Sequence, residues 1–300
     1  MSNVFDWHEM MPKFNELKYQ YIYDFVNKSW AVYNGEEKIA AIDIDYDNVG
    51  DTAMLSKIFQ TSSGTVIQDL DIFSDFQIFR QRPEWKLLHI TIPQNIADFP
   101  AVYSEIFAGA IFVRARFHNV GCNPDDAWPQ VEKAINWLLT TDFFKAPAST
   151  RYHDCFAGGL CFHTLRVCQR IVDLMHTAVF GDVSKFGDAI FCALTHDWCK
   201  INMYEPYMRN VKNEETGVWE KVQEYKFTNN PVINLGHGVS SMFLASKFFR
   251  LNPEEATAIR WHMGSFRVSP EEVNELQNSN ETFMLVHLLQ FADQLALVKY

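Results

Sequence analysis

The chain has 300 residues, of which 48% are hydrophobic and 21% are charged, and its formal net charge is −11. This composition is typical of a globular protein and excludes a disordered chain. Acidic residues outnumber basic ones in both halves, 20 against 12 in residues 1–150 and 17 against 14 in residues 151–300. This balance argues against duplex DNA as a partner.

The N-terminal sequence MSNVFDWHEMMPKF lacks the basic and then apolar segments of a signal peptide. No apolar run reaches the roughly 18 residues that a membrane-spanning helix needs. The six cysteines include no Cys-x-x-Cys pair, and Cys161 and Cys168, like Cys192 and Cys199, have the spacing of one helix face. We therefore expect buried free thiols in a cytoplasmic protein with no membrane partner.

The first part of the chain predicts a small α+β domain over residues 1–122, whose role the sequence does not indicate. Apolar residues in 8–30 have roughly helical spacing. Short β-branched or alternating segments predict strands over 38–46, 65–73 and 85–92. Residues 99–117 predict a helix that runs into a strand. This part contains no phosphate-binding loop, nucleophile elbow or dinucleotide fingerprint.

Residues 123–300 predict a mainly α domain. The segment 123–144 has an Asp at the N-cap, an early proline and apolar residues at helical spacing. Further helices are predicted over 157–179, 186–200, 238–250, 253–263 and 281–298. Two alternating runs around a polar Glu-Thr-Gly tip predict an inserted β-hairpin over 207–227. The domain boundary is predicted near 120–125, with 145–150 as the alternative.

Several predicted helices place a metal-competent side chain on or beside their apolar stripe. These side chains are His163, His196, Asp197, His262 and Asp293. A single histidine on an apolar face is usually a core residue with a hydrogen bond. Asp293, in line with Val286 and Leu289, is harder to explain, because a buried carboxylate needs a cation or close partners. Imidazoles and carboxylates together suit a mid-row divalent ion.

The order His…His-Asp…Asp, formed by His163, His196-Asp197 and Asp293, resembles the HD superfamily of metal-dependent phosphohydrolases. HDWCK is similar to that family's His-Asp-x-x-Lys. HDCFAGGLCFHT is similar to the His-His-x-x-x-Gly-Gly-Leu-x-x-His-Thr stretch of HD-domain 3′–5′ exoribonucleases and of some conjugative relaxases. LGHG and RWHMG stand where those branches have Gly-His and His-His-Gly. The resemblance covers roughly residues 145–300 and implies an all-helical HD domain.

Two positions depart from these motifs. His153-Asp154 stands in place of two adjacent histidines, and Trp261-His262-Met263-Gly264 stands in place of His-His-Gly. One histidine remains at each place, so the ligand number is retained while the substrate contacts differ. The hairpin is similar to an insertion in small HD hydrolases of bacteria and phages. Residues 1–122 show no sign of the nucleic-acid-binding β-barrel that precedes the domain in the exoribonucleases.

The resemblance implies a ligand set for one or two divalent ions, which would be Mn, Fe, Mg or Zn. One ion would be held by His163, His196, Asp197 and Asp293. Asp197 would bridge to a second ion held by His237 and His262. Two such ions can activate a bridging water for an in-line displacement at phosphorus, which makes Asp197 a candidate catalytic residue.

Four further residues are candidates for substrate chemistry. Lys200, three residues beyond Asp197, would pair with that carboxylate or with a substrate phosphate, unless it is a solvated lysine at a helix end. His153 would contact substrate or transfer a proton, and the alternative is an ordinary loop histidine. Arg209 and Lys212 on the hairpin are candidates for phosphate contacts, against the simpler interpretation of exposed strand charges.

Together these features predict a metal-dependent phosphohydrolase acting on a nucleotide or on the end of a single-stranded nucleic acid. The acidic charge favours the small substrate. The alternative is a non-catalytic nucleotide sensor or assembly subunit that retains the HD fold, but such a protein has no chemical reason to keep Asp293 buried opposite histidines. A relaxase is disfavoured, because no transesterification tyrosine is identifiable. The sequence leaves homo-oligomerisation open.

Overall fold

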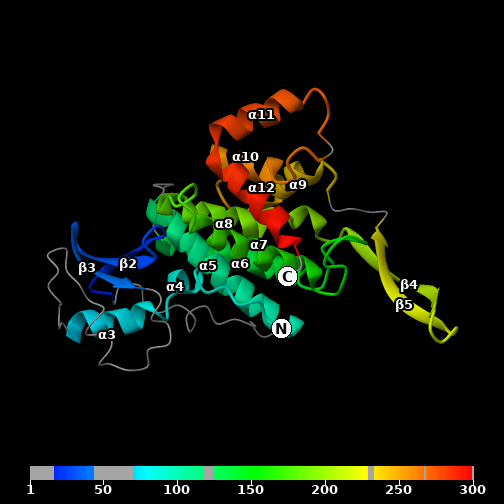
Figure 1. Ribbon diagram of the computed structural model, residues 1–300, viewed down its shortest axis with the longest axis horizontal. Coiled ribbons are helices and arrows are strands. Elements are labelled where there is room, and N and C mark those ends of the chain that lie inside the picture. The colour runs from blue at the N-terminus through cyan, green and yellow to red at the C-terminus, as the bar shows by residue number, and fades with distance from the viewer. Residues whose placement is uncertain (1–16, 44–69, 118–123, 229–232, 267, 299–300) are drawn as a thin grey trace.

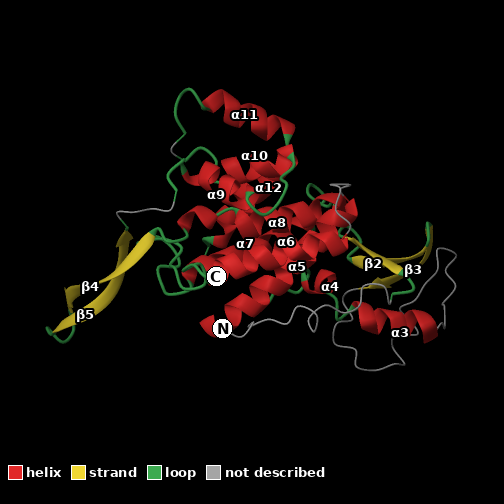
Figure 2. Ribbon diagram, turned by 180° about the vertical axis from the view of Figure 1, so that it is seen from behind, coloured by secondary structure: helices red, strands yellow, loops and turns green. Residues whose placement is uncertain are grey.

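The computed structural model describes residues 17–43, 70–117, 124–228, 233–266 and 268–298. Figure 1 shows packed helices at the centre, a small sheet at one end and a long β-hairpin that projects at the other. Figure 2 shows the same arrangement from behind. The described part of the chain is mainly helical, as predicted, and its two sheets are small and antiparallel.

The N-terminal sheet has three strands that pair in chain order. They are β1 (Gln20–Asp24), β2 (Ser29–Asn34) and β3 (Glu37–Asp43). β1 pairs with β2 from Gln20–Tyr33 to Asp24–Ser29. The strand predicted over 38–46 is confirmed as far as residue 43, and 44–46 lie outside the described residues.

The helix predicted over 8–30 is wrong from residue 17 onward, and residues 8–16 lie outside the described part of the chain. The alternate residues Tyr19, Tyr21 and Tyr23 are buried, with exposures of 6%, 2% and 3%. This period of two buries one face of a strand, and tyrosine favours that conformation. The roughly helical spacing of the apolar residues in this segment therefore did not predict its structure correctly.

The strand predicted over 65–73 is wrong where the structure describes it. Residues 65–69 lie outside the described part, and the rest begins helix α3 (Leu70–Phe79). Its residues Ile72, Phe76 and Phe79 are spaced four and three apart and are all buried. The ring of Phe79 stacks on Tyr21 with 4.2 Å between centroids, so this helix covers the N-terminal sheet.

The strand predicted over 85–92 is also wrong. The segment begins in the short helix α4 (Pro83–Lys86) and continues as a turn, in which Leu88 N donates to Trp85 O at 3.2 Å. Leu87 and Ile90 are buried at 0% and 7% exposure. These apolar side chains are three residues apart, which is the spacing of a helical turn rather than of a strand.

Residues 99–117 form one continuous helix, α5 (Phe99–Phe117), after the 3-10 turn η3 (Ile96–Asp98). The predicted change to a strand is wrong, because the β-branched Ile111 and Val113 are buried helix residues. Ile96–Phe117 is long and apolar enough to cross a membrane, but half of its apolar window is buried in the fold. α5 therefore has the character of a core helix in a soluble protein, and the cytoplasmic location stays a prediction.

The helices predicted for the second half of the chain are confirmed. They are α6 (Pro124–Leu139), α7 (Gly159–Met175), α8 (Phe186–Thr195), α9 (His237–Ser246), α10 (Pro253–Trp261) and α12 (Met284–Ala296). Two 3-10 turns flank α8, namely η4 (Val183–Lys185) and η5 (Trp198–Lys200). Helix α11 (Val273–Thr282) was not predicted, because it has few apolar residues and Leu276 is its one buried residue.

The predicted hairpin is confirmed. β4 (Tyr204–Lys212) pairs antiparallel with β5 (Trp219–Phe227), from Tyr204–Phe227 at the base to Lys212–Trp219 near the tip. Two hydrogen bonds hold the base, from Thr228 N to Met203 O at 2.9 Å and from Asn202 N to Asp142 Oδ1 at 2.7 Å. Figures 1 and 2 both show the hairpin projecting away from the helices.

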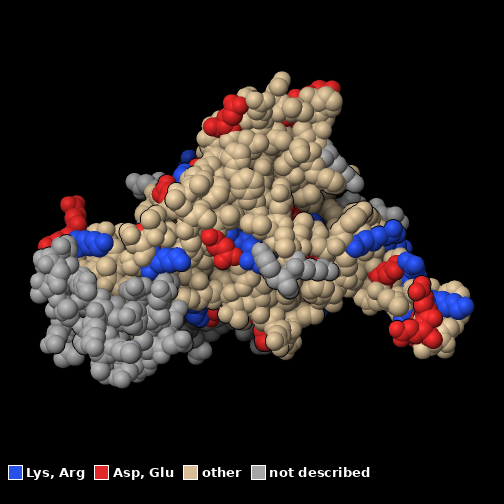
Figure 3. All heavy atoms as spheres, viewed as in Figure 1, with Lys and Arg blue, Asp and Glu red and all other residues tan. Residues whose placement is uncertain are grey.

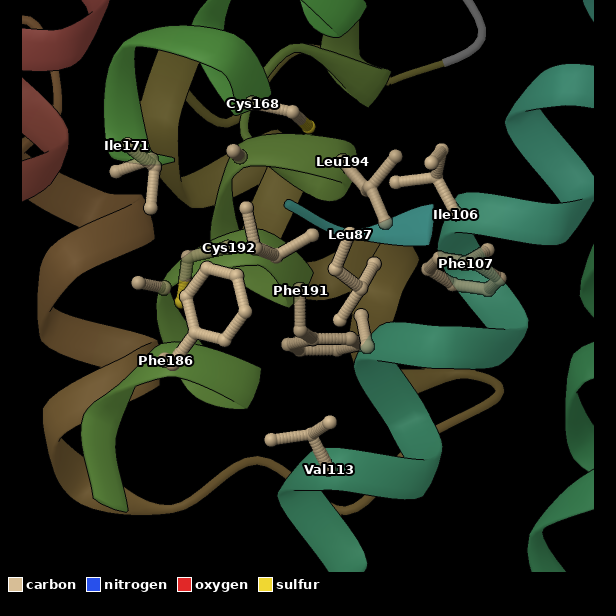
Figure 4. Packing of buried hydrophobic residues seen from close by; sticks show 14 of the residues in the cluster. Leu87, Ile106, Phe107, Val113, Cys168, Ile171, Phe186, Phe191, Cys192 and Leu194 are labelled. Atoms are coloured by element: carbon tan, nitrogen blue, oxygen red, sulfur yellow. The ribbon is translucent and has the colours of Figure 1, made fainter. Parts of the chain in front are cut away.

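α5 and α8 pack against each other in the core, part of which is shown in Figure 4. The ring of Phe107 on α5 stacks with Phe191 on α8 at 6.1 Å between centroids. The hydroxyl of Tyr103 donates to Leu194 O at 2.7 Å. The predicted N-terminal and helical domains therefore share a core at this place, and the boundary itself stays a prediction.

Candidate metal centre

His163 lies on α7, and the loop before this helix is built around two glycines. Gly158 has a φ of +84°, and a Cβ on Gly159 would lie 1.9 Å from Asp154 O. The chain therefore folds back closely on itself before α7 begins, as a tight helix entry requires. This turn places Asp154 Oδ2 3.7 Å from His163 Nδ1. His163 is 1% exposed.

His196 and His262 occupy equivalent positions, each directly after the last residue of a helix, α8 or α10. His196 Nδ1 lies 2.6 Å from Ala193 O, and His262 Nδ1 lies 2.8 Å from Ile259 O. A carbonyl oxygen can only accept a hydrogen bond, so Nδ1 carries the proton in both rings. The backbone of the last helical turn thus fixes each ring and leaves Nε2 for a second interaction.

His237 is the first residue of α9 and forms the solvent side of the cluster. The adjacent Gly238 allows a close approach of α9 to α10, because a Cβ there would lie 2.1 Å from Arg260 O. The rings of His237 and His262 are 5.1 Å apart between centroids. His237 Nε2 lies 2.8 Å from Asp197 Oδ1, and 30% of the His237 side chain is exposed.

Asp197 lies at the centre of the cluster. Its Oδ2 is 3.3 Å from His196 Nε2 and 3.7 Å from His163 Nε2, and its Oδ1 is 3.7 Å from His262 Nε2. Asp293 of α12 places Oδ1 3.0 Å from His163 Nε2 and 4.0 Å from His196 Nε2. The structure therefore brings all six predicted ligands together from α7, the end of α8, α9, the end of α10 and α12.

The nitrogen and oxygen atoms of this cluster fit a cation. His196 Nε2 and His262 Nε2 are buried and have no hydrogen-bond partner within the described residues. In neutral rings these atoms carry lone pairs, and they lie near the carboxylate oxygens of Asp197 and Asp293. Acceptors that face each other in a buried site are costly unless a proton or cation lies between them. The residues present therefore suit a divalent ion.

Among the described residues, three groups of donor atoms are compact enough for an ion, with the atoms of each group within 4.8 Å of one another. They are His163–His196–Asp197, His196–His262–Asp293 and Asp197–Cys199–His237. This grouping differs from the predicted division, which assigned His262 and His237 to the same ion. Asp197 belongs to two of the groups, as a bridging carboxylate would.

Cys199 is a candidate ligand that the sequence analysis missed. Its Sγ is 3.3 Å from His237 Nδ1, and the residue is 3% exposed. Burial and the nearby Asp197 raise the pKa of this thiol to about 12. The feature of the sequence that could have identified Cys199 as a ligand is its position two residues after Asp197, in the same short turn. The expectation of buried free thiols is confirmed for Cys161, Cys168, Cys192 and Cys199, whereas Cys155 is free but half-buried and Cys122 lies outside the described residues.

Burial and local charges act in opposite directions on the two carboxylates. Burial raises the pKa of Asp197, but the Lys200 ammonium and His196 hold it well below its usual value. Burial likewise raises the pKa of Asp293, and the hydrogen bond and charge of His163 lower it by more. Both carboxylates are therefore ionised, which is the state that binds a metal.

The imidazoles of His163 and His153, near the start of α7, have different protonation states at pH 7. Burial lowers the pKa of His163, but Asp154 and Asp293 raise it to about 9, so this ring holds a proton that a bound metal would displace. The ring of His153 lies 4.9 Å from that of His163. Burial and the charges of His163 and Lys200 lower the pKa of His153 to about 4. His153 is therefore a neutral imidazole at pH 7.

Lys200 borders the cluster and is not a solvated lysine. It is 7% exposed, and its Nζ donates to Asp197 Oδ2 at 2.6 Å. One of the two expected pairings, the pairing with Asp197, is therefore present. Burial lowers the pKa of Lys200, but the charge of Asp197 raises it by more, so the ammonium stays charged.

The two basic residues predicted to contact phosphate lie on the projecting hairpin. Arg209 donates to Glu224 Oε1 at 2.9 Å. Lys212 stands at the distal end of β4, in register with Trp219. Within the described part of the chain, no contact joins either residue to the histidine–aspartate cluster. They also lie on opposite faces of the strand, because one has an odd and the other an even position.

A cavity of about 340 Å³ opens beside His237, within the usual size range of small-molecule sites. Its wall is formed by the start of α9, the end of α10 and the segment after it, and includes the apolar Met263. Arg260 and Glu272 form an ion pair in this wall, and the Arg260 guanidinium lies 4.0 Å from the centroid of the Trp261 ring. The cavity and the cluster share His237.

The fold and the site define a mainly helical protein with a buried histidine–aspartate cluster that suits a divalent ion. No family model matches the chain, no curated protein matches it, and no solved structure matches it.

Proposed function

We propose that the protein is a metal-dependent phosphohydrolase of the HD type, which hydrolyses a phosphoester bond in a nucleotide or at the end of a single-stranded nucleic acid. One observation carries the proposal. His196 Nε2 and His262 Nε2 are buried without a hydrogen-bond partner in the described residues, near the carboxylates of Asp197 and Asp293. A structural core rarely retains such atoms. Metal-binding histidines often have this arrangement, with the other ring nitrogen donating to a backbone carbonyl.

The ligands proposed for the ion or ions are those with buried donor atoms. They are His163, His196, Asp197, His262 and Asp293, with His237 and Cys199 extending the site toward solvent. The chemistry that a divalent ion supplies when bound is a more acidic water and neutralisation of charge on phosphoryl oxygens. Mn, Fe, Mg and Zn are the candidate ions, and the imidazole and thiol donors favour Fe or Zn over Mg.

Lys200 and His153 have different proposed roles. Lys200 holds the carboxylate of Asp197 in place through their 2.6 Å contact, and is therefore a positioning residue. His153 is neutral at pH 7, and its Nε2 has no hydrogen-bond partner in the described residues. This imidazole is suited to accept a hydrogen bond from the reacting group, whereas a pKa of about 4 makes it a poor proton acceptor at pH 7. The cavity beside His237 is the proposed place for the part of the substrate that follows the phosphate.

Metal analysis of the purified protein, combined with a substrate panel, tests the proposal. The panel contains deoxynucleoside triphosphates, cyclic dinucleotides, short RNA and DNA, and a chromogenic phosphodiester. We expect bound divalent metal and a hydrolysis rate that falls about 100-fold or more in Asp197→Ala. Protein without metal, or equal activity in this variant, would contradict the proposal. Bound metal without hydrolysis of any substrate would identify the non-catalytic sensor or assembly subunit instead.

His287→Gln is the matched control for this experiment. His287 lies on α12, as Asp293 does, but its Nε2 contacts Asn280 O at 2.8 Å rather than the cluster. We therefore expect this variant to retain the metal content and the activity of the wild type. A loss as large as that of Asp197→Ala would show that any change in this region disturbs the protein.

A further inference from the structure

The hairpin has one face that is rich in aromatic side chains. Successive residues of a strand point to opposite faces, and residues paired in register share a face. The pairs Tyr204–Phe227, Pro206–Tyr225, Met208–Gln223 and Lys212–Trp219 therefore lie on one side. We call this side, with its rings Tyr204, Trp219, Tyr225 and Phe227, the aromatic face.

The charges of the hairpin are segregated between its two faces. Glu205, Glu220 and Glu224 lie opposite the aromatic face, where Glu205 pairs with Lys226 and Glu224 pairs with Arg209. The aromatic face carries Lys212 and Lys221 and, within the strands 204–212 and 219–227, no acidic residue, while Glu214 and Glu215 lie in the tip loop between the strands. Figure 3 shows that charged side chains of both signs gather on the projecting hairpin. A protein with a net charge of −11 thus presents a basic aromatic surface here.

The aromatic face is open to solvent over most of its length. Trp219, Phe227 and Met208 are 67%, 63% and 57% exposed. A two-stranded hairpin is barely stable alone, and large apolar side chains exposed on one of its faces, with polar residues between them, are consistent with an interaction site. Within the described residues, Trp219 and Phe227 stay exposed, whereas Tyr204 and Tyr225 are half-buried.

The base of the aromatic face lies close to the metal centre along the chain. Tyr204 follows Lys200 by four residues, and Lys200 contacts Asp197. The rings of Tyr204 and Phe227 are 5.3 Å apart between centroids at this base. The strands run for nine residues from there to the tip, which is about 30 Å. The rings therefore form a row that begins near the cluster and ends near Trp219.

We propose that the aromatic face binds single-stranded nucleic acid, with bases stacked on the rings and phosphates near Lys212 and Lys221. Base–aromatic stacking beside basic side chains is how proteins bind single strands without sequence readout. Association of two copies through this face fits less well, because it would bring the lysines of both copies into one apolar interface. The conclusion that the substrate is a polynucleotide rests on the proposed function. The binding of a single strand to the aromatic face does not depend on that function.

Fluorescence anisotropy with a short labelled phosphorothioate single strand tests the binding on the full chain. We expect Trp219→Ser to weaken binding about ten-fold. Replacing Lys212 and Lys221 together by Gln should reduce the dependence of log affinity on log salt by about 0.7 for each lost phosphate contact. Val222→Ser is the matched control, because Val222 is 43% exposed on the opposite face of the same strand. We expect it to bind as the wild type does.

Three outcomes would overturn the inference. The first is a wild type that does not bind the strand. The second is equal binding by Trp219→Ser and Val222→Ser. The third is a change from dimer to monomer in Trp219→Ser, seen by light scattering, without a change in affinity for the strand, which would make this face an interface between copies.

Hydrolysis rates separate this inference from the proposed function. We expect Trp219→Ser to lose about ten-fold more activity on an oligonucleotide than on a chromogenic phosphodiester. Binding that depends on Trp219, in a protein that hydrolyses neither substrate, would support the aromatic face and contradict the phosphohydrolase. Hydrolysis of both substrates with equal loss in the variant would support the enzyme and contradict the face.

Discussion

Arg114 on α5 and Glu255 on α10 form a buried ion pair with two hydrogen bonds. Nε and one terminal nitrogen of Arg114 donate to the two carboxylate oxygens of Glu255, and the same terminal nitrogen donates to Arg250 O at 2.5 Å. Glu255 also accepts from Asn252 N at 2.8 Å, within the capping box that begins α10. The pair therefore joins α5 to the helix that ends directly before His262.

Breaking this pair should destabilise the protein strongly. Arg114→Met keeps most of the side-chain volume but leaves the Glu255 carboxylate buried without its counterion. We expect the free energy of unfolding to fall by roughly 3–5 kcal/mol, measured by urea denaturation. Lys86→Met is the control, because it breaks a half-exposed pair with Glu105 and should cost less than about 1 kcal/mol. Equal losses in the two variants would contradict the expectation.

Asp188, beside this pair, should make stability depend on pH. Burial and the charge of Glu255 raise its pKa to about 8, although Arg114 opposes them. Between about pH 4 and pH 8 the folded protein then holds a proton that the unfolded chain has lost. The stabilising contribution is complete below this range and is lost as the pH rises through it.

Asp188→Asn removes this titration. Relative to the variant, the wild type should lose roughly 1–3 kcal/mol of stability between about pH 5 and pH 8, measured by chemical denaturation at each pH. The asparagine retains the shape of the side chain, so the comparison isolates the proton. A wild type that gains stability over the variant as the pH rises would contradict the assigned direction.

Gly238 controls how closely α9 approaches α10. In Gly238→Ala the Cβ would meet Arg260 O at 2.1 Å, so the two helices must move apart. His237 and His262 lie on either side of this contact. We expect a loss of about 1–3 kcal/mol in stability and roughly ten-fold weaker metal binding by titration calorimetry. Ser246→Ala, at the exposed end of α9, should change neither quantity, and an unchanged affinity in Gly238→Ala would show that this contact does not set the site.

Helices α7, α8 and α12 could be predicted because each has a strong apolar period, and on α7 and α12 one polar ligand falls within it. Asp293 in line with Val286 and Leu289 is the clearest case, since a carboxylate there must have a partner. The sequence indicated which side chains turn inward. It could not indicate that His262 groups with His196 and Asp293 rather than with His237, because that depends on the packing of α8, α10 and α12.

The N-terminal part was predicted poorly because local composition and tertiary packing disagree there. The apolar residues of α3 and α5 include several β-branched ones, yet burial on one helix face decided their structure. The opposite case is the segment with Tyr19, Tyr21 and Tyr23, where burial of one face of a strand determined the structure although the apolar spacing is roughly helical. Cys199 was missed because its spacing from Cys192 suggested a structural thiol, while its neighbours in space are His237 and Asp197.

The histidine–aspartate cluster predicts that stability depends on a divalent ion. Chelation should lower the free energy of unfolding by about 2.7 kcal/mol from its value at a free metal concentration of about 100 times Kd. The reason is that the ion binds the folded protein, whereas the unfolded chain does not bring the ligands together. Thermal unfolding with and without chelator measures this difference. A wild type that does not respond would contradict the metal site.

Asp293→Asn shows whether this response comes from the cluster. Asp293 Oδ1 lies 3.0 Å from His163 Nε2, and an amide oxygen is a weaker ligand than a carboxylate. The chelator should therefore change the stability of this variant by less than about a third of the wild-type difference. His287→Gln on the same helix should retain the full difference, because its ring contacts Asn280 O instead. An equal response in Asp293→Asn and the wild type would place the ion outside the cluster.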